Sequence, residues 1–333
     1  MARTRVGIIG LGMAAGHHAR SLIDLKDEVE VVAAFSPTEA RRSRFCEQYG
    51  LPVTGNVDDI FDADTVDAVL ILTPPNTHLE LVERAAAVGQ HILLEKPLDV
   101  SLERAKAIVS AADEAGVLLS IVFQNRFRSS YRTLEALLRS GELGTILEAS
   151  ASIRNWRPQS YYDEPGRGTL ARDGGGVLLT QGIHTIDLLL NLAGQPQDIA
   201  AFARTTPVHT METEDLVSGA FAFENGASGT LMATTCAYPG YPERIELICT
   251  RGTAVLTGDS LEAHLRDGRA IVESATGSAG FKADPMAFGH ELHRALIADF
   301  LAAVRGQRPP MVSGNDALRA HTFIDAILAS GKR

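Results

Sequence analysis

Cysteine is scarce in this sequence, and the few that occur follow no pairing or metal-binding pattern. Cys46, Cys236 and Cys249 are widely separated, and none belongs to a C-x-x-C motif. A sparse and odd number of cysteines is typical of a reducing compartment and argues against a disulfide-stabilised scaffold. The sequence also lacks a continuous apolar run of membrane-spanning length and a signal-peptide core near its start. We therefore expect a cytoplasmic protein with no membrane-spanning helix.

Positive charge is also in short supply. The chain has 31 Lys and Arg residues against 41 Asp and Glu residues, which gives a formal net charge of −10. Because nucleic-acid backbones are bound by basic surfaces, this balance argues against a nucleic-acid partner. The length of 333 residues and the hydrophobic fraction of 45% indicate a globular enzyme of two domains that acts on a small molecule. No metal site is expected, since His290 and His293 have no third ligand at a suitable spacing.

Over residues 1–124, short runs rich in Val, Ile and Leu alternate with amphipathic segments. The runs are RVGIIG, VEVVAAF, VDAVLIL, QHILLE and VLLSIVF. Continuous apolar runs of this length are typical of parallel strands that helices bury on both faces. Right-handed crossovers then produce a doubly wound sheet, so the sequence predicts an α/β, Rossmann-type domain over residues 1–124.

The first predicted strand ends in a glycine-rich turn, GLGMAA, which opens a helix. Gly10 and Gly12 match the G-x-G-x-x-G/A fingerprint, and Ala15 fills its last position. In this motif the first glycine permits a tight turn, the second lets the backbone approach a pyrophosphate, and the helix start supplies N–H donors. The sequence therefore predicts dinucleotide binding, with Gly10, Gly12, Met13 and Ala14 in the binding loop.

The end of the second predicted strand bears on the choice between NAD and NADP. An acidic residue there would bind the ribose 2′-hydroxyl of NAD, but the sequence has Ser36, with Arg41 and Arg42 shortly after. A serine hydroxyl and an arginine can instead hold a 2′-phosphate through charge-assisted hydrogen bonds. This pattern favours NADP over NAD, with Ser36 and Arg41 as contacts, although the two arginines could equally be solvated helix charges.

Two further segments fall at the carboxyl ends of predicted strands, where the ligands of doubly wound sheets bind. They are residues 73–78 (TPPNTH) and 95–97 (EKP). Lys96 is either a surface residue of its loop or a donor positioned beside the cofactor. The candidate cofactor contacts in these segments are Thr73, Pro74, Asn76, His78, Glu95 and Lys96.

Residues 125–333 show a different pattern, in which apolar and polar residues alternate as in half-exposed strands. Turn dipeptides such as Asn225-Gly226 and Asp267-Gly268 separate the alternating segments and are typical of hairpins. The sequence therefore predicts a second α/β domain over 125–333, with an open, mostly antiparallel sheet, for substrate binding and oligomerisation. Two closing helices are expected near residues 289–304 and 315–329, and the last could pack back on the first domain.

An apolar stretch at residues 174–191, GGGVLLTQGIHTIDLLLN, carries a polar stripe. The stripe lies along one face of the predicted helix and consists of Thr180, His184, Asp187 and Asn191. Polar groups on such an apolar helix need partners, because their burial is otherwise costly. One interpretation sets His184 against a reactive ligand as the proton-transfer group, and the other treats it as a satisfied core histidine.

The segment before this helix, residues 156–172, is rich in Trp, Tyr and Arg. Aromatic faces with hydrogen-bonding tips suit a sugar or a nucleotide sugar, and loops often carry binding residues. The alternative is a plain connecting loop. The candidate substrate residues here are Trp156, Arg157, Tyr161, Tyr162 and Arg167.

Together, GLGMAA, TPPNTH, EKP, QNRF, SGELG and GGGVLLTQGIHTIDLL resemble the landmarks of the Gfo/Idh/MocA family of oxidoreductases. The resemblance implies hydride transfer between a nicotinamide and a hydroxyl or carbonyl of a sugar, polyol or nucleotide sugar, in a homodimer or homotetramer. It implies that Lys96 lies near the reacting hydroxyl and that His184 is the general base or acid. Many members carry an aspartate at the position of Thr180, which is therefore a candidate catalytic residue, and Arg126 in QNRF is a further candidate substrate contact.

Two other functions are compatible with this resemblance. Some relatives are glycosidases that retain NAD and oxidise the substrate transiently, and others are dinucleotide sensors without catalysis. A sensor needs neither Lys96 nor His184, so their presence favours a dehydrogenase or reductase.

Overall fold

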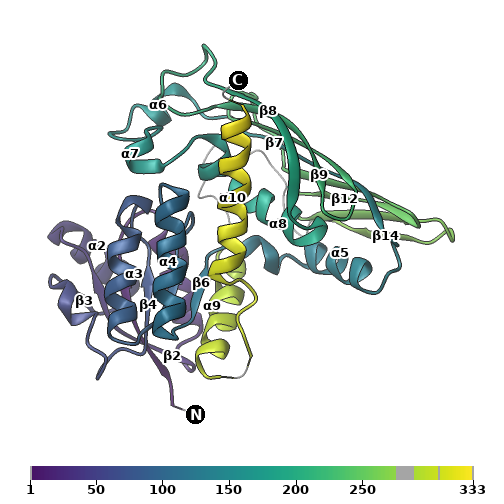
Figure 1. Ribbon diagram of the computed structural model, residues 1–333. Helices are drawn as coiled ribbons and strands as arrows, with labels where there is room; N and C mark the ends of the chain where they lie inside the picture. The colour runs from purple at the N-terminus through teal and green to yellow at the C-terminus, as the bar shows by residue number, and fades with distance from the viewer. Residues whose placement is uncertain (1, 275–288, 307, 332–333) are drawn as a thin grey trace. The chain divides into compact units, whose positions relative to one another are not determined.

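The computed structural model describes residues 2–274, 289–306 and 308–331. The chain forms two compact units, Met1–Gln124 with Asp284–Leu318, and Asn125–Ala283 with Arg319–Arg333 (Figure 1). The expected second domain over 125–333 is therefore not one continuous block. Helix α9 (Glu291–Val304) and the first residues of α10 (Gly314–Ser330) belong to the first unit.

The first unit contains a parallel sheet of six strands in the order β3-β2-β1-β4-β5-β6. This order confirms the predicted doubly wound sheet. Its central strands are buried on both faces, as their continuous apolar sequences require, and all four residues of β4 are buried. The strands are β1 (Thr4–Ile9), β2 (Val29–Phe35), β3 (Val53–Thr54), β4 (Ala68–Ile71), β5 (His91–Leu94) and β6 (Leu119–Ile121).

Helices connect these strands. Helices α3 and α4 lie side by side along the sheet (Figure 1). Ser101 caps the start of α4 by accepting the N–H of Arg104, and Gly116 ends that helix in the left-handed conformation. The helices between the strands are α1 (Ala15–Asp24), α2 (Glu39–Tyr49), α3 (His78–Ala87) and α4 (Leu102–Ala115).

Helix α9 packs against α1, although contacting residues such as Asp24 and Arg294 are 270 positions apart in the sequence. The hydroxyl of Ser21 donates to the carbonyl of His290 at 3.2 Å. Arg294 forms an ion pair with Asp24 at 3.1 Å, and other contacts of this kind follow along the two helices. The start of α10 carries the reciprocal cap expected of a capping box, in which Ser313 and Asp316 bond each other's backbone N–H.

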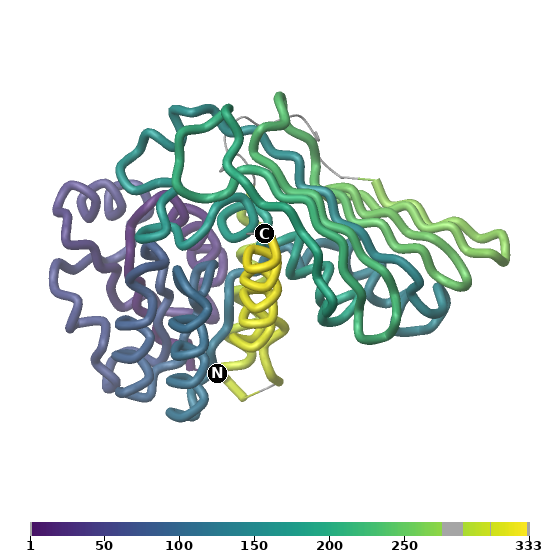
Figure 2. Tube along the Cα trace, turned by 45° about the horizontal axis from the view of Figure 1, so that its top comes forward, coloured from purple at the N-terminus to yellow at the C-terminus, as the bar shows by residue number. Residues whose placement is uncertain are grey.

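The second unit is built on a sheet of eight strands in the order β14-β13-β12-β11-β7-β10-β9-β8 (Figure 2). All neighbouring pairs are antiparallel except β7 and β10, which confirms a mostly antiparallel sheet. Gly226 and Gly268 adopt positive φ angles at the predicted hairpin turns. The strands are β7 (Ile146–Arg154), β8 (Pro196–Arg204), β9 (Leu216–Phe223), β10 (Ser228–Thr234), β11 (Arg244–Cys249), β12 (Gly252–Thr257), β13 (Ser260–Leu265) and β14 (Ala270–Glu273).

Helices α5 (Ser129–Arg139) and α8 (Ile183–Ala193) cover one face of this sheet. A π-helical turn, Leu178–Gly182, leads directly into α8. Gly182 has a packing role, because a Cβ there would lie 3.2 Å from the side chain of Ile153 on β7. Alternate residues of β7 are buried under the helices, and those between them face the opposite side of the sheet.

By length and composition alone, Leu170–Ala193 is apolar enough to cross a membrane, which differs from the sequence expectation. The structure buries 72% of its most apolar window. Gly174 ends α7 (Leu170–Asp173) with a φ of 74°, so the segment is not one regular helix. Such burial is typical of the core helix of a folded domain.

Candidate active site

The glycine-rich turn after β1 has the geometry that its sequence predicts. Gly10 has a φ of 104°, and a Cβ there would lie 2.8 Å from the carbonyl carbon of Leu72. An ideal Cβ on Gly12 would meet no atom within 4 Å, and the neighbouring Met13 is 66% exposed. Only glycine can take the first conformation without strain, and the open space at the second admits a ligand. With Ala14 at the start of α1, these residues fit a dinucleotide pyrophosphate.

All the candidate cofactor residues follow the carboxyl ends of parallel strands. Because those ends meet at one edge of a sheet, the residues gather at the place where doubly wound sheets bind ligands. Strand order reverses between β1 and β4, which bracket the crevice at this edge. The candidates are Gly10, Gly12, Met13 and Ala14 after β1, Ser36 and Arg41 after β2, Thr73, Pro74, Asn76 and His78 after β4, and Glu95 and Lys96 after β5.

The residues after β2 differ in their exposure. Ser36 is buried, and its hydroxyl accepts the N–H of Thr38 at 3.3 Å. Arg42 donates to the carbonyl of Ser36 at 2.7 Å, whereas Arg41 is exposed on α2. Arg42 therefore stabilises the turn, and Arg41 is the better placed of the two to reach a ligand.

His78 holds two loops together, which corrects its assignment as a cofactor contact. Its side chain is fully buried, with Nε2 2.9 Å from the carbonyl of Thr73 and Nδ1 3.0 Å from the carbonyl of Leu98. Burial lowers the pKa of this imidazole. The imidazole of His78 thus lies between the segment after β4 and the segment after β5.

Sequence reasoning missed His18, which is engaged with Glu95 inside the first unit. His18 Nε2 lies 2.9 Å from one oxygen of Glu95, and the other oxygen accepts the N–H of Lys96 at 3.1 Å. Burial alone would raise the pKa of Glu95, but the His18 hydrogen bond holds it at about 2. The Lys96–Pro97 bond is cis. Glu95 is therefore an internal partner that fixes the backbone at Lys96 rather than a surface acid.

The same histidine belongs to a cluster that includes one of the histidines of α9. The rings of His17 and His18 pack on His293 at centroid distances of 5.2 Å. His18, Glu95 and His293 hold potential ligand atoms within 4.8 Å of one another. Burial, together with the nearby His18, lowers the pKa of His293 to about 3. The expectation of no metal came from chain spacing, which does not show that α1, β5 and α9 meet.

In the second unit, the side chains of the polar stripe, residues 180–191, bond to different partners. Asp187 forms a buried, two-bond ion pair with Arg126 at 2.6 and 2.8 Å. Asn191 donates to the hydroxyl of Tyr131. The hydroxyl of Thr180 donates to the carbonyl of Gly176 at 2.6 Å. His184 is half-buried at the start of α8.

The ion pair also decides the role of Arg126. Its side chain is 5% exposed and that of Asp187 is 1% exposed, so each neutralises the other within the core. Arg126 is therefore a structural residue of the second unit, which corrects its assignment as a substrate contact.

The candidate substrate loop, residues 156–172, contains two short helices, α6 (Gln159–Tyr162) and α7. The guanidinium of Arg167 lies 4.2 Å from the ring centre of Tyr161, and that of Arg157 lies 5.5 Å from it. Trp156 is half-buried, with its ring 5.5 Å from that of Tyr238. The loop is thus ordered by cation–π and aromatic contacts of its own.

Tyr162 faces the interior, which corrects its assignment as a substrate contact. It is 8% exposed, and its hydroxyl donates to the hydroxyl of Thr235 at 3.1 Å. Burial raises the pKa of this phenol to about 12. Tyr162 anchors the loop, and Trp156, Arg157, Tyr161 and Arg167 remain its candidate ligand contacts.

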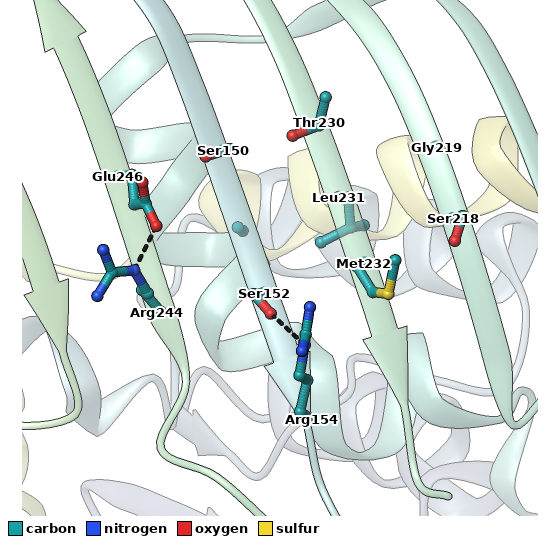
Figure 3. Close-up of a pocket in the computed structure, with 11 residues that line it drawn as sticks. Ser150, Ser152, Arg154, Ser218, Gly219, Thr230, Leu231, Met232, Arg244 and Glu246 are labelled. Atoms are coloured by element: carbon teal, nitrogen blue, oxygen red, sulfur yellow. Dashed lines mark hydrogen bonds and ion pairs between the residues drawn. The ribbon is translucent and has the colours of Figure 1, made fainter. Parts of the chain in front are cut away.

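The face of the second sheet opposite α5 and α8 carries a shallow hollow of about 280 Å³ (Figure 3). Six of its eleven lining residues are small, and two hydrogen-bonded pairs, Arg154 with Ser152 on β7 and Arg244 with Glu246 on β11, lie among them. This face is opposite α8, so the hollow is separate from His184. Exposed apolar residues also occur on strands of this sheet, among them Phe202, Met232 and Ile248.

The parallel sheet, its strand order and its glycine turn define the class of dinucleotide-binding proteins. Residues 4–123 match the model of an oxidoreductase family with an NAD-binding Rossmann fold, and residues 131–255 match the Gfo/Idh/MocA C-terminal domain. The chain therefore belongs to the Gfo/Idh/MocA family, and it is a nicotinamide-dependent oxidoreductase.

Several characterised proteins are similar over nearly the whole chain. Scyllo-inositol 2-dehydrogenase (NAD(+)) of Bacillus subtilis is 26% identical over 322 residues, which covers 95% of this chain and 90% of that protein. The WlbA dehydrogenase of Bordetella pertussis, solved with NADH and UDP-GlcNAcA, has a TM-score of 0.84 at 25% identity, covering 99% of this chain and 97% of that one. Levoglucosan dehydrogenase, solved with NADH and levoglucosan, has a TM-score of 0.88 at 22% identity, covering 99% and 98%. Relatives named for NAD and for NADP both occur.

Proposed function

We propose that the protein transfers a hydride between its nicotinamide cofactor and a carbinol or carbonyl carbon of a sugar, polyol or nucleotide sugar. The observation that carries this proposal is His184, a half-buried imidazole directly after a π-helical turn. Such turns are frequent at functional sites. The similarity to enzymes named for inositols, levoglucosan and a UDP-sugar supports the same substrate class.

In this proposal Lys96 donates a hydrogen bond to the reacting oxygen and His184 moves its proton. The nicotinamide, when bound, supplies the hydride acceptor or donor. Imidazole suits proton transfer because its ordinary pKa is close to neutrality. Thr180 cannot supply the negative charge of an aspartate, and its hydroxyl lies within hydrogen-bond distance of the carbonyl of Gly176 and of the side-chain oxygen of Gln181. We therefore assign Thr180 to holding the π turn, and the reaction to Lys96 and His184.

A panel of substrates tests the proposed function directly. Myo-inositol, levoglucosan, UDP-GlcNAcA and related sugars are incubated with NAD+ or NADP+, and the absorbance of the reduced nicotinamide is followed. We expect turnover with at least one member of this class. Release of a free aglycone without net change in reduced nicotinamide would instead assign the chain to the glycosidases.

We further propose that NADP is preferred over NAD, with exposed Arg41 contacting the 2′-phosphate. The Arg41→Ala variant should raise the KM for NADP by about tenfold or more, because a charge-assisted bond to phosphate is lost, while the KM for NAD changes little. Steady-state kinetics with both cofactors measures this. Arg44→Ala, exposed on the same helix, is the matched control and should leave both values unchanged. Equal changes for NADP and NAD in Arg41→Ala would contradict the assignment.

We also propose that the chain forms a homodimer or homotetramer through the face of the second sheet that lies opposite α5 and α8. Small side chains and exposed apolar residues on this face support close contact between copies. Light scattering after size-exclusion chromatography should give two or four times the chain mass of 35.6 kDa. Thr230→Arg, at the centre of the face, should lower that mass, whereas Glu103→Arg on α4 should not. An unchanged mass for Thr230→Arg would place the contact elsewhere.

A further inference from the structure

The connection between β8 and β9, residues 205–215, makes hydrogen bonds to two segments that lie far from it in the chain. On one side it binds the substrate loop, residues 156–172. On the other side it binds the segment that begins the His184 helix. Its last two residues, Glu214 and Asp215, are both buried acids. Neither belongs to the reaction proposed above.

Asp215 gathers four donors around its carboxylate. One oxygen accepts the N–H of Thr206 at 2.8 Å. The other lies 2.8 Å from the hydroxyl of Thr206, 2.8 Å from Nδ1 of His209 and 3.3 Å from the thiol of Cys236. The side chains of Asp215 and His209 are both 0% exposed. A carboxylate buried this completely is retained where its hydrogen bonds are all made.

His209 connects the Asp215 carboxylate to the substrate loop. Its Nε2 lies 2.8 Å from the carbonyl of Arg157, which can only accept a hydrogen bond. The carboxylate of Asp215 likewise only accepts, so the ring donates from Nε2 to Arg157 and from Nδ1 to Asp215. The ring of His209 also packs edge-on against Tyr162, with centroids 4.8 Å apart. The imidazole thus fixes the loop beside Trp156.

Further bonds join the same two segments. Gln159 and Thr210 exchange hydrogen bonds, with the Thr210 N–H donating to the Gln159 side chain at 2.8 Å. The carbonyl of Gly168 accepts the N–H groups of Glu212 and Thr213 at 3.1 and 3.2 Å. The connection therefore holds the loop near both of its ends.

Glu214 holds the beginning of the His184 helix. Its two carboxylate oxygens accept the N–H groups of Gly176 at 2.9 Å and Leu178 at 3.1 Å, and its backbone carbonyl accepts the N–H of Val177. The two backbones are so close that a Cβ on Gly176 would lie 1.8 Å from the carbonyl oxygen of Glu214. This contact gives a physical reason for glycine at position 176 and fixes where the π turn starts.

We propose that Glu214 and Asp215 are a pair of positioning residues, through which one connection sets both the substrate loop and the His184 helix. Asp215 acts on the loop through His209, and Glu214 acts on the helix through its first N–H groups. This inference rests on the proposed function, because it treats the loop as the substrate contact and His184 as the proton-transfer group. It predicts that adjacent residues in the chain control different kinetic constants.

The kinetic test uses the full-length protein and whichever of myo-inositol, levoglucosan and UDP-GlcNAcA supports the fastest reduction of the nicotinamide. Asp215→Ala should raise the KM for that substrate by about tenfold with kcat nearly unchanged, since it loosens binding alone. Glu214→Gln should lower kcat by about tenfold or more with little change in KM, because an amide N–H₂ faces a backbone N–H and displaces the helix. The KM for the nicotinamide should stay constant in both variants.

A conservative variant and a matched control separate positioning from general stability. Asp215→Asn should restore the substrate KM, because an asparagine amide can still form a hydrogen bond with Nδ1 of His209 while Nε2 donates to Arg157. Glu243→Gln breaks the ion pair with Arg128 in the same unit without removing any of the bonds described above, and should change neither constant. If Glu243→Gln produced the same losses, or if Asp215→Ala left KM unchanged, the proposal would be overturned.

Trp156, the single tryptophan of the chain, provides a readout that needs no turnover. Its ring lies 6.3 Å from that of His209, so its fluorescence reports on the loop. Acrylamide quenching should increase about twofold in Asp215→Ala and remain at the wild-type level in Asp215→Asn and Glu243→Gln. Unchanged quenching in Asp215→Ala contradicts the positioning role. Increased quenching together with normal turnover of His184→Ala would retain the positioning role and reject the proposed active site.

Discussion

The His184→Ala variant is expected to lose about 100- to 10,000-fold in kcat, the range that a positioned general base or acid contributes. His184 is half-buried at the start of α8, and no carboxylate stands at position 180 to take over the proton. The loss should fall on kcat more than on the substrate KM, because proton transfer takes place in the transition state. Steady-state kinetics with the best substrate of the panel measures both constants.

The interpretation of this result needs a fold control. His264→Ala removes an exposed imidazole from β13 in the same unit and should leave turnover unchanged. The thermal midpoint of His184→Ala should stay close to that of the wild type, since the side chain that is removed is half-buried rather than part of the core. Near-normal turnover of a folded His184→Ala protein would return this residue to the role of a core histidine.

Replacement of Lys96 by methionine is expected to reduce kcat/KM by about 100- to 1,000-fold, the cost of losing one donor aimed at an oxygen that develops charge. Methionine keeps much of the apolar volume of the lysine stem, so the change isolates the ammonium group. The backbone at this position is held by Glu95, which accepts the Lys96 N–H, and is expected to keep its place. Kinetics with saturating nicotinamide measures the loss.

Binding of the cofactor distinguishes chemistry from assembly in this variant. Fluorescence titration with reduced nicotinamide should give a Kd within about threefold of the wild type for Lys96→Met, because the pyrophosphate is held by the glycine turn. Lys106→Met, exposed on α4, is the matched control and should leave both turnover and binding unchanged. Retention of full activity by Lys96→Met would remove this residue from the reaction.

The fold was predictable because its signals are local. Five apolar runs and a glycine turn after the first of them define a doubly wound sheet, since the period of hydrophobicity and the turn chemistry act over a few residues. The hairpin dipeptides of the second unit are signals of the same kind. The packing of α9 on α1 was not predictable, because no local pattern in the sequence shows that these two helices meet.

The site was predictable only in part, for a related reason. Buried polar residues need hydrogen-bond partners, but their spacing in the sequence does not identify those partners. His78, Arg126 and Tyr162 carry suitable chemistry for ligand contact, yet each is committed to a buried internal bond. Glu214 and Asp215 were overlooked because acids in a connection between strands usually lie in solvent.

The packing of α9 on α1 affects how the protein folds while it is synthesised on the ribosome. The acceptor side of each ion pair, at Asp24 and Glu28, is synthesised roughly 270 residues before its partner, Arg294 or Arg305. Contacts with so large a sequence separation form late, because the intervening chain must be closed into a loop first. The nascent amino-terminal sheet must therefore persist, with α1 not yet covered by α9, while residues 125–283 of the second unit are translated. A chaperone that shields apolar surface would act mainly during that interval.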